Sequence, residues 1–268
     1  MLANPNELFA FLNQIDALPK KGLSQNFLID ANIVRKIVKA SAIKPGDCVL
    51  EIGPGPGALT EALLEAGAHV IAVEKDRRLA NALPRLQIDK RLQVIEGDFL
   101  EIELNTLLKD LPPVKVVANL PYNITSPILE RLCDHYARFS SAFLMVQKEM
   151  ADRIVAKSRT KEISSFTIFL KTYSDPSIAV KVSRHCFYPE PKVDSCVIRL
   201  DFHAPLMNDP KRFTAMVRRA FQQRRKMLRS TLSIQYKEFA TLRPEDLSYE
   251  QWMQLFNKIS ETDGSTNL

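Results

Sequence analysis

Long apolar runs are absent from this 268-residue sequence. No stretch approaches 18 consecutive apolar residues, which excludes a transmembrane helix. The N-terminal region also lacks a basic segment followed by an apolar one, so no secretory signal is expected. The sequence is 46% hydrophobic and 25% charged, an ordinary balance for a globular protein. We therefore expect a cytoplasmic protein with no membrane partner.

Cysteine is scarce and follows no pattern. The four cysteines, Cys48, Cys133, Cys186 and Cys196, form no CxxC pair and have no histidine at zinc-ligand spacing. They are therefore expected to be reduced thiols, in keeping with a cytoplasmic location, and no metal is expected.

Acidic residues are missing from residues 211–229, where lysine and arginine are frequent. Apolar residues there recur at helical spacing, so the pattern predicts an amphipathic helix with a basic face. Such a face is often only solvated. With a formal net charge of +6, contact with a phosphate backbone is the favoured interpretation. The candidate RNA-binding residues are Arg218, Arg219, Arg224, Arg225, Lys226 and Arg229.

Apolar strands alternate with helical patterns along most of the chain. Strands are expected at 48–52, 69–74, 92–95, 114–117 and 142–146, followed by a pair at 177–182 and 195–202. This order predicts an α/β fold of the Rossmann-like type, with a mostly parallel sheet and helices on both faces. Residues 203–210 have linker composition, so a first domain at 1–204 and a helical one at 205–268 are expected. Residues 260–268 are expected to form a disordered tail.

A glycine-rich turn follows the first of these strands. Gly53 and Gly55 fit a dinucleotide-binding pattern, but that pattern alone is weak. Pro54 and Pro56 remove two backbone N–H donors that a pyrophosphate would need, and Glu51 would repel a phosphate. A carboxylate favours a ligand bearing positive charge. The turn therefore suits S-adenosylmethionine better than a nicotinamide dinucleotide.

Acidic residues also end the next two strands. Glu74 stands at the position where a carboxylate can accept the hydroxyls of an adenosine ribose. Its alternative role is a helix N-cap or a surface charge. Asp98 can accept the amino group of the adenine, and Phe99 can flank the ring.

The fourth strand ends in Asn119, Leu120, Pro121 and Tyr122. The Asn119 amide oxygen and a carbonyl held by Pro121 can each accept one N–H of an exocyclic amine, and Tyr122 offers a ring for stacking. The alternative is an ordinary turn rich in Asn and Pro. A later loop stiffened by two prolines presents Phe187 and Tyr188, one of which could stack on the opposite face of the base or else fill the core.

These segments, taken together, resemble the bacterial adenine dimethyltransferases of small-subunit ribosomal RNA (the KsgA/RsmA family) over nearly the whole chain. The matching segments are residues 24–30, 51–60, 74, 97–98, 119–124, 187–195 and 220–226. The last two are the most specific to the family. Ser24 stands where the family usually has glycine.

The resemblance implies a class I methyltransferase domain, a small helical RNA-binding domain, and S-adenosylmethionine as cofactor. It implies transfer of methyl groups to N6 of two adjacent adenosines near the 3′ end of 16S rRNA, a role in small-subunit biogenesis, and a monomer. The implied cofactor-binding residues are Asn26, Leu28, Gly53, Glu74, Asp98 and Asn119, to which the residue pattern adds Glu51, Gly55 and Phe99. The candidate catalytic residues are Asn119, Leu120, Pro121, Tyr122 and Phe187.

Three alternatives remain at this point. A macrolide-resistance methyltransferase of 23S rRNA would share the core and a helical C-terminal domain. A non-catalytic RNA-binding assembly factor with a relict cofactor fold is the second. A nicotinamide-dependent oxidoreductase is the least favoured, because of the two prolines in the turn.

Overall fold

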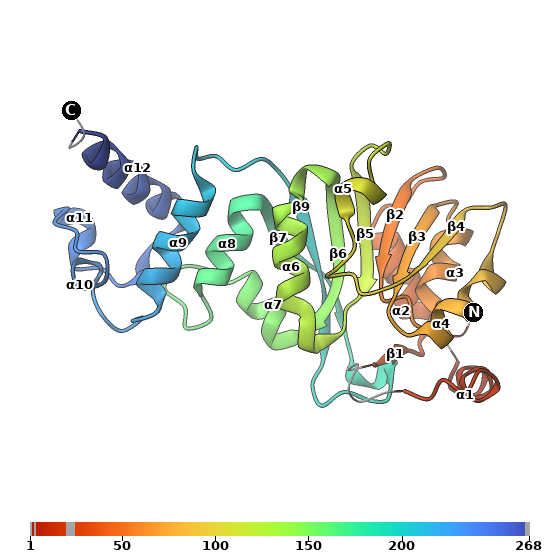
Figure 1. The fold of residues 1–268 in the computed structure, drawn as a ribbon. Helices are drawn as coiled ribbons and strands as arrows, with labels where there is room; N and C mark the ends of the chain where they lie inside the picture. The colour runs from red at the N-terminus through yellow and green to blue at the C-terminus, as the bar shows by residue number, and fades with distance from the viewer. Residues whose placement is uncertain (1, 3, 20–24, 266–268) are drawn as a thin grey trace. The chain divides into compact units, whose positions relative to one another are not determined.

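The computed structural model describes residues 2, 4–19 and 25–265 (Figure 1). Ser24, at the position where the resemblance departs from its family, lies outside this described part. The chain divides into two compact units. The first comprises Met1–Ala151 and Asp175–His203, and the second comprises Asp152–Ser174 and Ala204–Leu268. One segment of the second unit starts at Ala204, and its other segment, Asp152–Ser174, lies within the range 1–204 that the sequence-based division assigned to the first domain.

Seven strands of the described chain form one sheet, in the order β4-β3-β2-β5-β6-β9-β7. Their bounds are β2 (Cys48–Ile52), β3 (His69–Glu74), β4 (Leu92–Glu96), β5 (Val114–Asn119), β6 (Phe139–Gln147), β7 (Ser174–Val182) and β9 (Ser195–Phe202). Strands β4 to β6 run parallel, and β9 is antiparallel to β6. The sheet is therefore mostly parallel, as expected, and the carboxyl ends of β2, β3, β4 and β5 meet at one edge.

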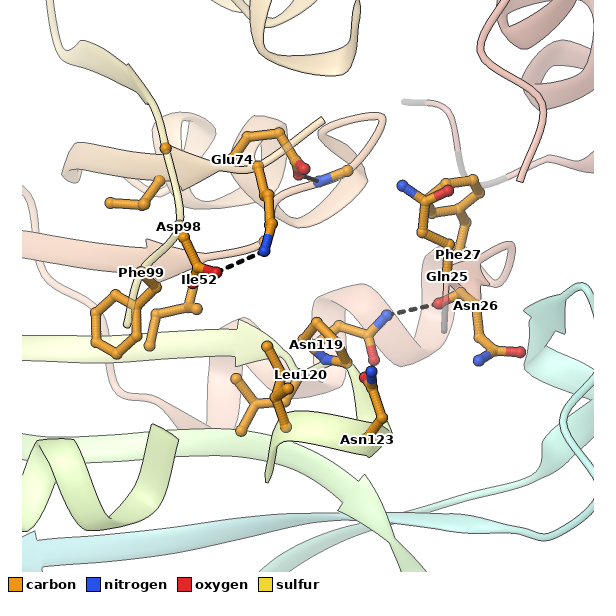
Figure 2. Close-up of a pocket in the computed structure, with 17 residues that line it drawn as sticks. Gln25, Asn26, Phe27, Ile52, Glu74, Asp98, Phe99, Asn119, Leu120 and Asn123 are labelled. Carbon is orange, nitrogen blue, oxygen red and sulfur yellow. Dashed lines mark hydrogen bonds and ion pairs between the residues drawn. The ribbon is translucent and has the colours of Figure 1, made fainter. Parts of the chain in front are cut away.

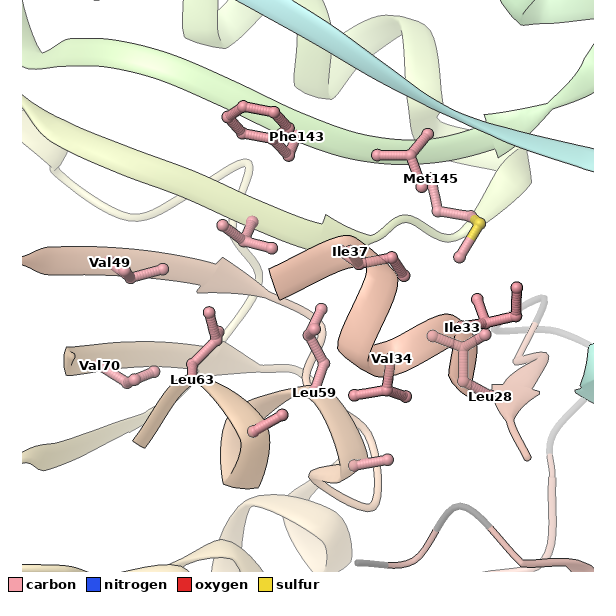
Figure 3. Packing of buried hydrophobic residues seen from close by; sticks show 14 of the residues in the cluster. Leu28, Ile33, Val34, Ile37, Val49, Leu59, Leu63, Val70, Phe143 and Met145 are labelled. Atoms are coloured by element: carbon pink, nitrogen blue, oxygen red, sulfur yellow. The ribbon is translucent and has the colours of Figure 1, made fainter. Parts of the chain in front are cut away.

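Helices connect the parallel strands: α3 (Ala58–Glu65), α4 (Arg77–Ala82), the single turn α5 (Leu104–Leu107) and α6 (Thr125–Asp134). Helix α2 (Ala31–Ala40) precedes the first of these strands, and α7 (Lys148–Ile154) follows the last. Asp30 caps α2 by accepting from the N–H groups of Asn32 and Ile33. The apolar faces of α2 and α3 pack on the sheet in one buried cluster, which Figure 3 shows from close by.

A smaller cluster surrounds the N-terminal helix α1 (Pro5–Gln14). Leu8 and Leu12 are fully buried there, as the helical spacing of apolar residues predicts. Strand β1 (Phe27–Leu28) pairs antiparallel with β8 (Phe187–Tyr188) beside it, and the ring of Tyr188 packs edge-on against Phe9 at 4.3 Å between centroids. This two-stranded ladder fixes the segment that precedes α2.

The second unit is helical and has its own core around Trp252. Its helices are α8 (Ser165–Tyr173), α9 (Pro210–Phe221), α10 (Leu228–Thr231), α11 (Lys237–Ala240) and α12 (Tyr249–Ser265). The helix expected over 211–229 is shorter than predicted, because α9 ends at Phe221 and turns precede α10. Residues 260–265, expected as part of a disordered tail, belong instead to α12. Tyr236 donates to the Lys258 carbonyl and bonds Thr262, which supports the last turns of α12.

No helix in the described ranges is long and apolar enough to cross a membrane.

Candidate functional site

A pocket opens at the sheet edge where the parallel strands end (Figure 2). Its lining comes from the segment around β1 and from the carboxyl ends of β2, β3, β4 and β5. The residues are Gln25, Asn26, Phe27, Ile52, Gly53, Gly55, Val73, Glu74, Lys75, Gly97, Asp98, Phe99, Asn119, Leu120, Pro121, Asn123 and Ile124. The structure therefore brings together strand ends that are distant in sequence, at the edge where ligands of open α/β sheets lie.

The turn after β2 approaches the pocket with two glycines in left-handed backbone. Gly53 has φ +66° and Gly55 has φ +58°, values that side chains strongly disfavour. At Gly55 a Cβ atom would also come within 3.0 Å of the Phe27 ring. The Gly53 N–H donates to the Val73 carbonyl, which ties the turn to β3. The turn thus leaves room for a ligand close to its backbone.

Glu74 is buried at the end of β3, and both of its carboxylate oxygens are held by backbone. The N–H of Gly55 donates to Oε2 at 2.9 Å, and that of Asp76 donates to Oε1 at 2.8 Å. Burial raises the pKa of this carboxyl, while these two hydrogen bonds oppose the shift. Each oxygen retains a further lone pair, so a fixed carboxylate can accept ligand hydroxyls here. The helix α4, in contrast, is capped by Asp76 and not by Glu74.

Asp98 and Lys75 lie beside each other at neighbouring strand ends, and they form an ion pair of 2.6 Å between Oδ2 and Nζ. The Leu100 N–H donates to the other oxygen at 2.9 Å. The hydrogen bond from Lys75 lowers the pKa of Asp98, and its charge acts in the same direction. Phe99 lines the pocket from a largely buried position, 4% exposed.

Asn119 is the last residue of β5, and only one end of its side-chain amide, the nitrogen, has a hydrogen-bond partner among the described residues. Its Nδ2 donates to the Asn26 carbonyl at 2.8 Å, which orients the side chain. Its Oδ1 is buried and has no hydrogen-bond partner within the described residues. Buried acceptors are rarely left unpaired, so this oxygen is poised for a donor supplied by a ligand. The arrangement makes Asn119 an acceptor of fixed direction.

The carbonyl of Pro121 is already engaged. It accepts from the Ile124 N–H at 3.2 Å, and the Thr125 hydroxyl lies 3.3 Å from both this carbonyl and that of Tyr122. Leu120 and Pro121 line the pocket, whereas Tyr122 does not. The Tyr122 hydroxyl lies 2.9 Å from the Ser195 hydroxyl, in hydrogen-bonding contact.

Three more expected site residues lie away from the pocket surface. Leu28 and Phe187 pair across β1 and β8 and belong to the buried core, with exposed fractions of 4% and 2%. Phe187 thus occupies the alternative position that the sequence left open for it. Glu51 is buried beneath the turn, and neither of its carboxyl oxygens has a hydrogen-bond partner in the described chain. Burial raises the pKa of Glu51 to about 8. Burial thus opposes the negative charge through which the sequence argument gave this residue a role.

The basic residues proposed to bind RNA have two kinds of surroundings in the second unit. Arg224 pairs with Glu245 and donates to the carbonyls of Lys161 at 2.6 Å and Thr160 at 3.2 Å. It therefore holds the loop around residue 160 in place. The others are exposed at the surface: Arg218, Arg219, Arg225, Lys226 and Arg229.

Sequence reasoning missed several pocket residues. Lys75 directly follows Glu74, and Asn123 lies within the matching segment 119–124, so position along the chain was the available signal for both. Gln25 and Phe27 flank Asn26, and Ile52, Val73, Gly97 and Ile124 adjoin other strand ends. Among the described residues, no group of three or more His, Cys, Asp or Glu side chains is placed to hold a metal ion.

Comparisons with known proteins match nearly the whole chain to the family that the sequence resembles. The family model described as ribosomal RNA adenine dimethylase matches residues 18–261. "Ribosomal RNA small subunit methyltransferase A" of Protochlamydia amoebophila is 47% identical, covering 97% of this chain and 98% of the relative. The protein of that name from Chlorobaculum parvum is 44% identical over 92% of both chains.

Two solved structures share the fold over most of their length. A dimethyladenosine transferase from Plasmodium falciparum superposes with a TM-score of 0.75 at 27% identity, covering 88% of this chain and 98% of that one. The 23S rRNA methyltransferase ErmE gives 0.71 at 28% identity, covering 88% and 100%. A dimethyladenosine transferase and a 23S rRNA methyltransferase thus both share this fold.

Proposed function

Because the chain belongs to the ribosomal RNA adenine dimethylase family, we propose that it methylates two adjacent adenosines near the 3′ end of small-subunit ribosomal RNA, at N6. The enzyme is an S-adenosylmethionine-dependent methyltransferase that acts on ribosomal RNA. The choice of 16S rRNA rests on relatives named for the small subunit at up to 47% identity, against 28% for the 23S enzyme. Action as a monomer in the cytoplasm, during small-subunit biogenesis, is part of the same proposal.

The hydrogen-bond acceptors that line the pocket are of the kind that S-adenosylmethionine requires. Glu74 offers two fixed carboxylate oxygens for the ribose hydroxyls, and Asp98 stands at the neighbouring strand end for the adenine amine. Gly53 and Gly55 leave space along the turn, and Phe99 flanks the same end of the pocket. When bound, S-adenosylmethionine would supply a methyl group carried on its sulfonium. The neutral thioether that remains after transfer is a good leaving group.

The unpartnered Oδ1 of Asn119 is the observation that carries the assignment of the target amine. It can accept one N–H of the adenine N6 amine, which favours a more tetrahedral nitrogen and stabilises the positive charge that develops on attack. The second acceptor in this proposal is a backbone carbonyl held by Pro121, in the Leu120–Pro121 segment that lines the pocket. Positioning of this kind can account for about 7–11 kcal/mol of barrier. The alkylated ammonium is strongly acidic, so its proton leaves without a side-chain base.

The target adenosine must leave its stack to reach this strand end, so single-stranded or loop RNA is the expected form. Tyr122 would stack on the extruded base. Exposed basic residues of the second unit, Arg225 and Lys226 among them, would contact phosphates.

The test uses separated ribosomal subunits that lack the modification. They are incubated with the protein and cofactor carrying a labelled methyl group, and the RNA of each subunit is analysed for N6,N6-dimethyladenosine. Label in 16S rRNA alone supports the proposal. Label in 23S rRNA would move the protein to the macrolide-resistance type, and no label in either RNA would favour a non-catalytic assembly factor.

A further inference from the structure

Lys75 occupies a position in the pocket that the reaction, as derived above, does not use. It follows Glu74 at the end of β3, next to the end of β4, where the Gly97 N–H donates to the Glu74 carbonyl at 2.9 Å. This pairing places the Lys75 ammonium 2.6 Å from Oδ2 of Asp98. The Lys75 ammonium is therefore bound to the Asp98 carboxylate, which we propose accepts the adenine amino group.

Both oxygens of Asp98 consequently have a donor before any ligand arrives. Oδ1 accepts from the Leu100 N–H, and Oδ2 accepts from Lys75. The two partners differ in freedom, because the Lys75 side chain is 58% exposed and that of Asp98 only 17%. The ammonium can thus turn out into water, whereas the carboxylate stays where it is.

We propose that Lys75 competes with the adenine amino group for Asp98 and so sets the affinity of the pocket for adenosine. The inference rests on the proposed function only for the identity of the cofactor. Binding exchanges an ammonium donor for a neutral amine donor, and the ion pair that is given up offsets part of the gain. The offset applies equally to S-adenosylmethionine and to its demethylated product, which share the adenosine. Lys75 therefore weakens both and favours product release.

The experiment compares Lys75→Met, which keeps the apolar stem and removes the charge, with wild type. Affinities for S-adenosylhomocysteine and for uncharged 5′-methylthioadenosine are measured by calorimetry. Lys75→Met is expected to bind both compounds about two- to fivefold more tightly, the range for a partly exposed ion pair. The difference should shrink as salt is added, because salt screens the pair in the wild type. Lys75→Arg, which retains a cation, should bind like the wild type.

Lys115→Met is the matched control. Lys115 forms a similar ion pair with Asp47 in the same unit, at 2.8 Å, and neither residue lines the pocket. Its loss should leave both affinities unchanged. Equal or weaker binding by Lys75→Met, with the wild type binding normally, overturns the inference and leaves the proposed function standing. If the wild type binds neither compound, the cofactor assignment fails together with the inference.

Discussion

The hydroxyl groups of Tyr122 and Ser195 lie 2.9 Å apart and join two segments that are distant in sequence. Tyr122 stands in the turn after β5, and Ser195 is the first residue of β9, paired with Gln147 at the end of β6. The contact holds the tyrosine ring from its far end. Ser195 is thus a positioning residue for the ring that we propose stacks on the target base.

Tyr122→Phe tests this contact. The ring remains but loses its hydrogen bond, worth about 0.5–1.5 kcal/mol, so the methylation rate should fall only a few-fold. Tyr122→Ala should lose most activity because it removes the ring. The measurement is single-turnover methylation of undermethylated small subunits with saturating cofactor. Ser195→Ala combined with Tyr122→Phe should be no worse than either change alone. Additive losses would show that the two hydroxyls act separately.

Glu51 should make stability depend on pH. Burial, and secondarily the charge of Glu74, raises its pKa from 4.5 to about 8 in the folded protein, while Thr60 acts against the shift. The folded state therefore holds the proton more tightly than the unfolded state, and this group lowers stability as pH rises from about 4.5 to about 8. Glu51→Gln should remove that decline and be more stable at pH 9 by roughly 2–5 kcal/mol. Urea unfolding of both proteins at pH 5, 7 and 9 measures it, and parallel profiles would contradict the prediction.

Two adjacent arginines in the second unit should have different roles, Arg224 in stability and Arg225 in RNA binding. Arg224→Ala removes the pair with Glu245 and two hydrogen bonds to carbonyls, so it should lower the free energy of unfolding by about 1–2 kcal/mol. Arg225→Ala should leave stability within about 0.5 kcal/mol. It should instead reduce the log–log salt slope of RNA binding by about 0.7–0.9. Thermal unfolding and salt titrations distinguish the two, and an unchanged slope in Arg225→Ala would remove that residue from the RNA surface.

The strand ends could be predicted from sequence because each is marked locally. The apolar run of β3 stops at Glu74, and that of β5 stops in Asn119 and Pro121, so both the strand and its polar end are visible in a short window. Parallel order then brings those ends to one edge.

Long-range partners could not be predicted in this way. Nothing near Arg224 indicates Glu245, and nothing near Tyr122 indicates Ser195, since each partner arrives by the packing of another element. The burial of Phe187 and Glu51 could not be predicted from the local sequence either. Their residue types suit a site, but the core encloses them, and a side chain's surroundings are a property of the whole fold.

Asn119 gives the sharpest test of the site. Its Nδ2 holds the Asn26 carbonyl, and its buried Oδ1 awaits a donor, so Asn119→Ala removes the orientation and the acceptor together. Loss of one group that stabilises developing charge lowers rates about 10²–10³-fold in comparable sites. Single-turnover methylation with saturating cofactor should show a loss of that size, accompanied by weaker S-adenosylhomocysteine binding in calorimetry. Asn123→Ala, a change of the same kind at another pocket residue, is the control and should lose much less. A wild-type rate for Asn119→Ala would mean that the methyl transfer takes place elsewhere than at the end of β5.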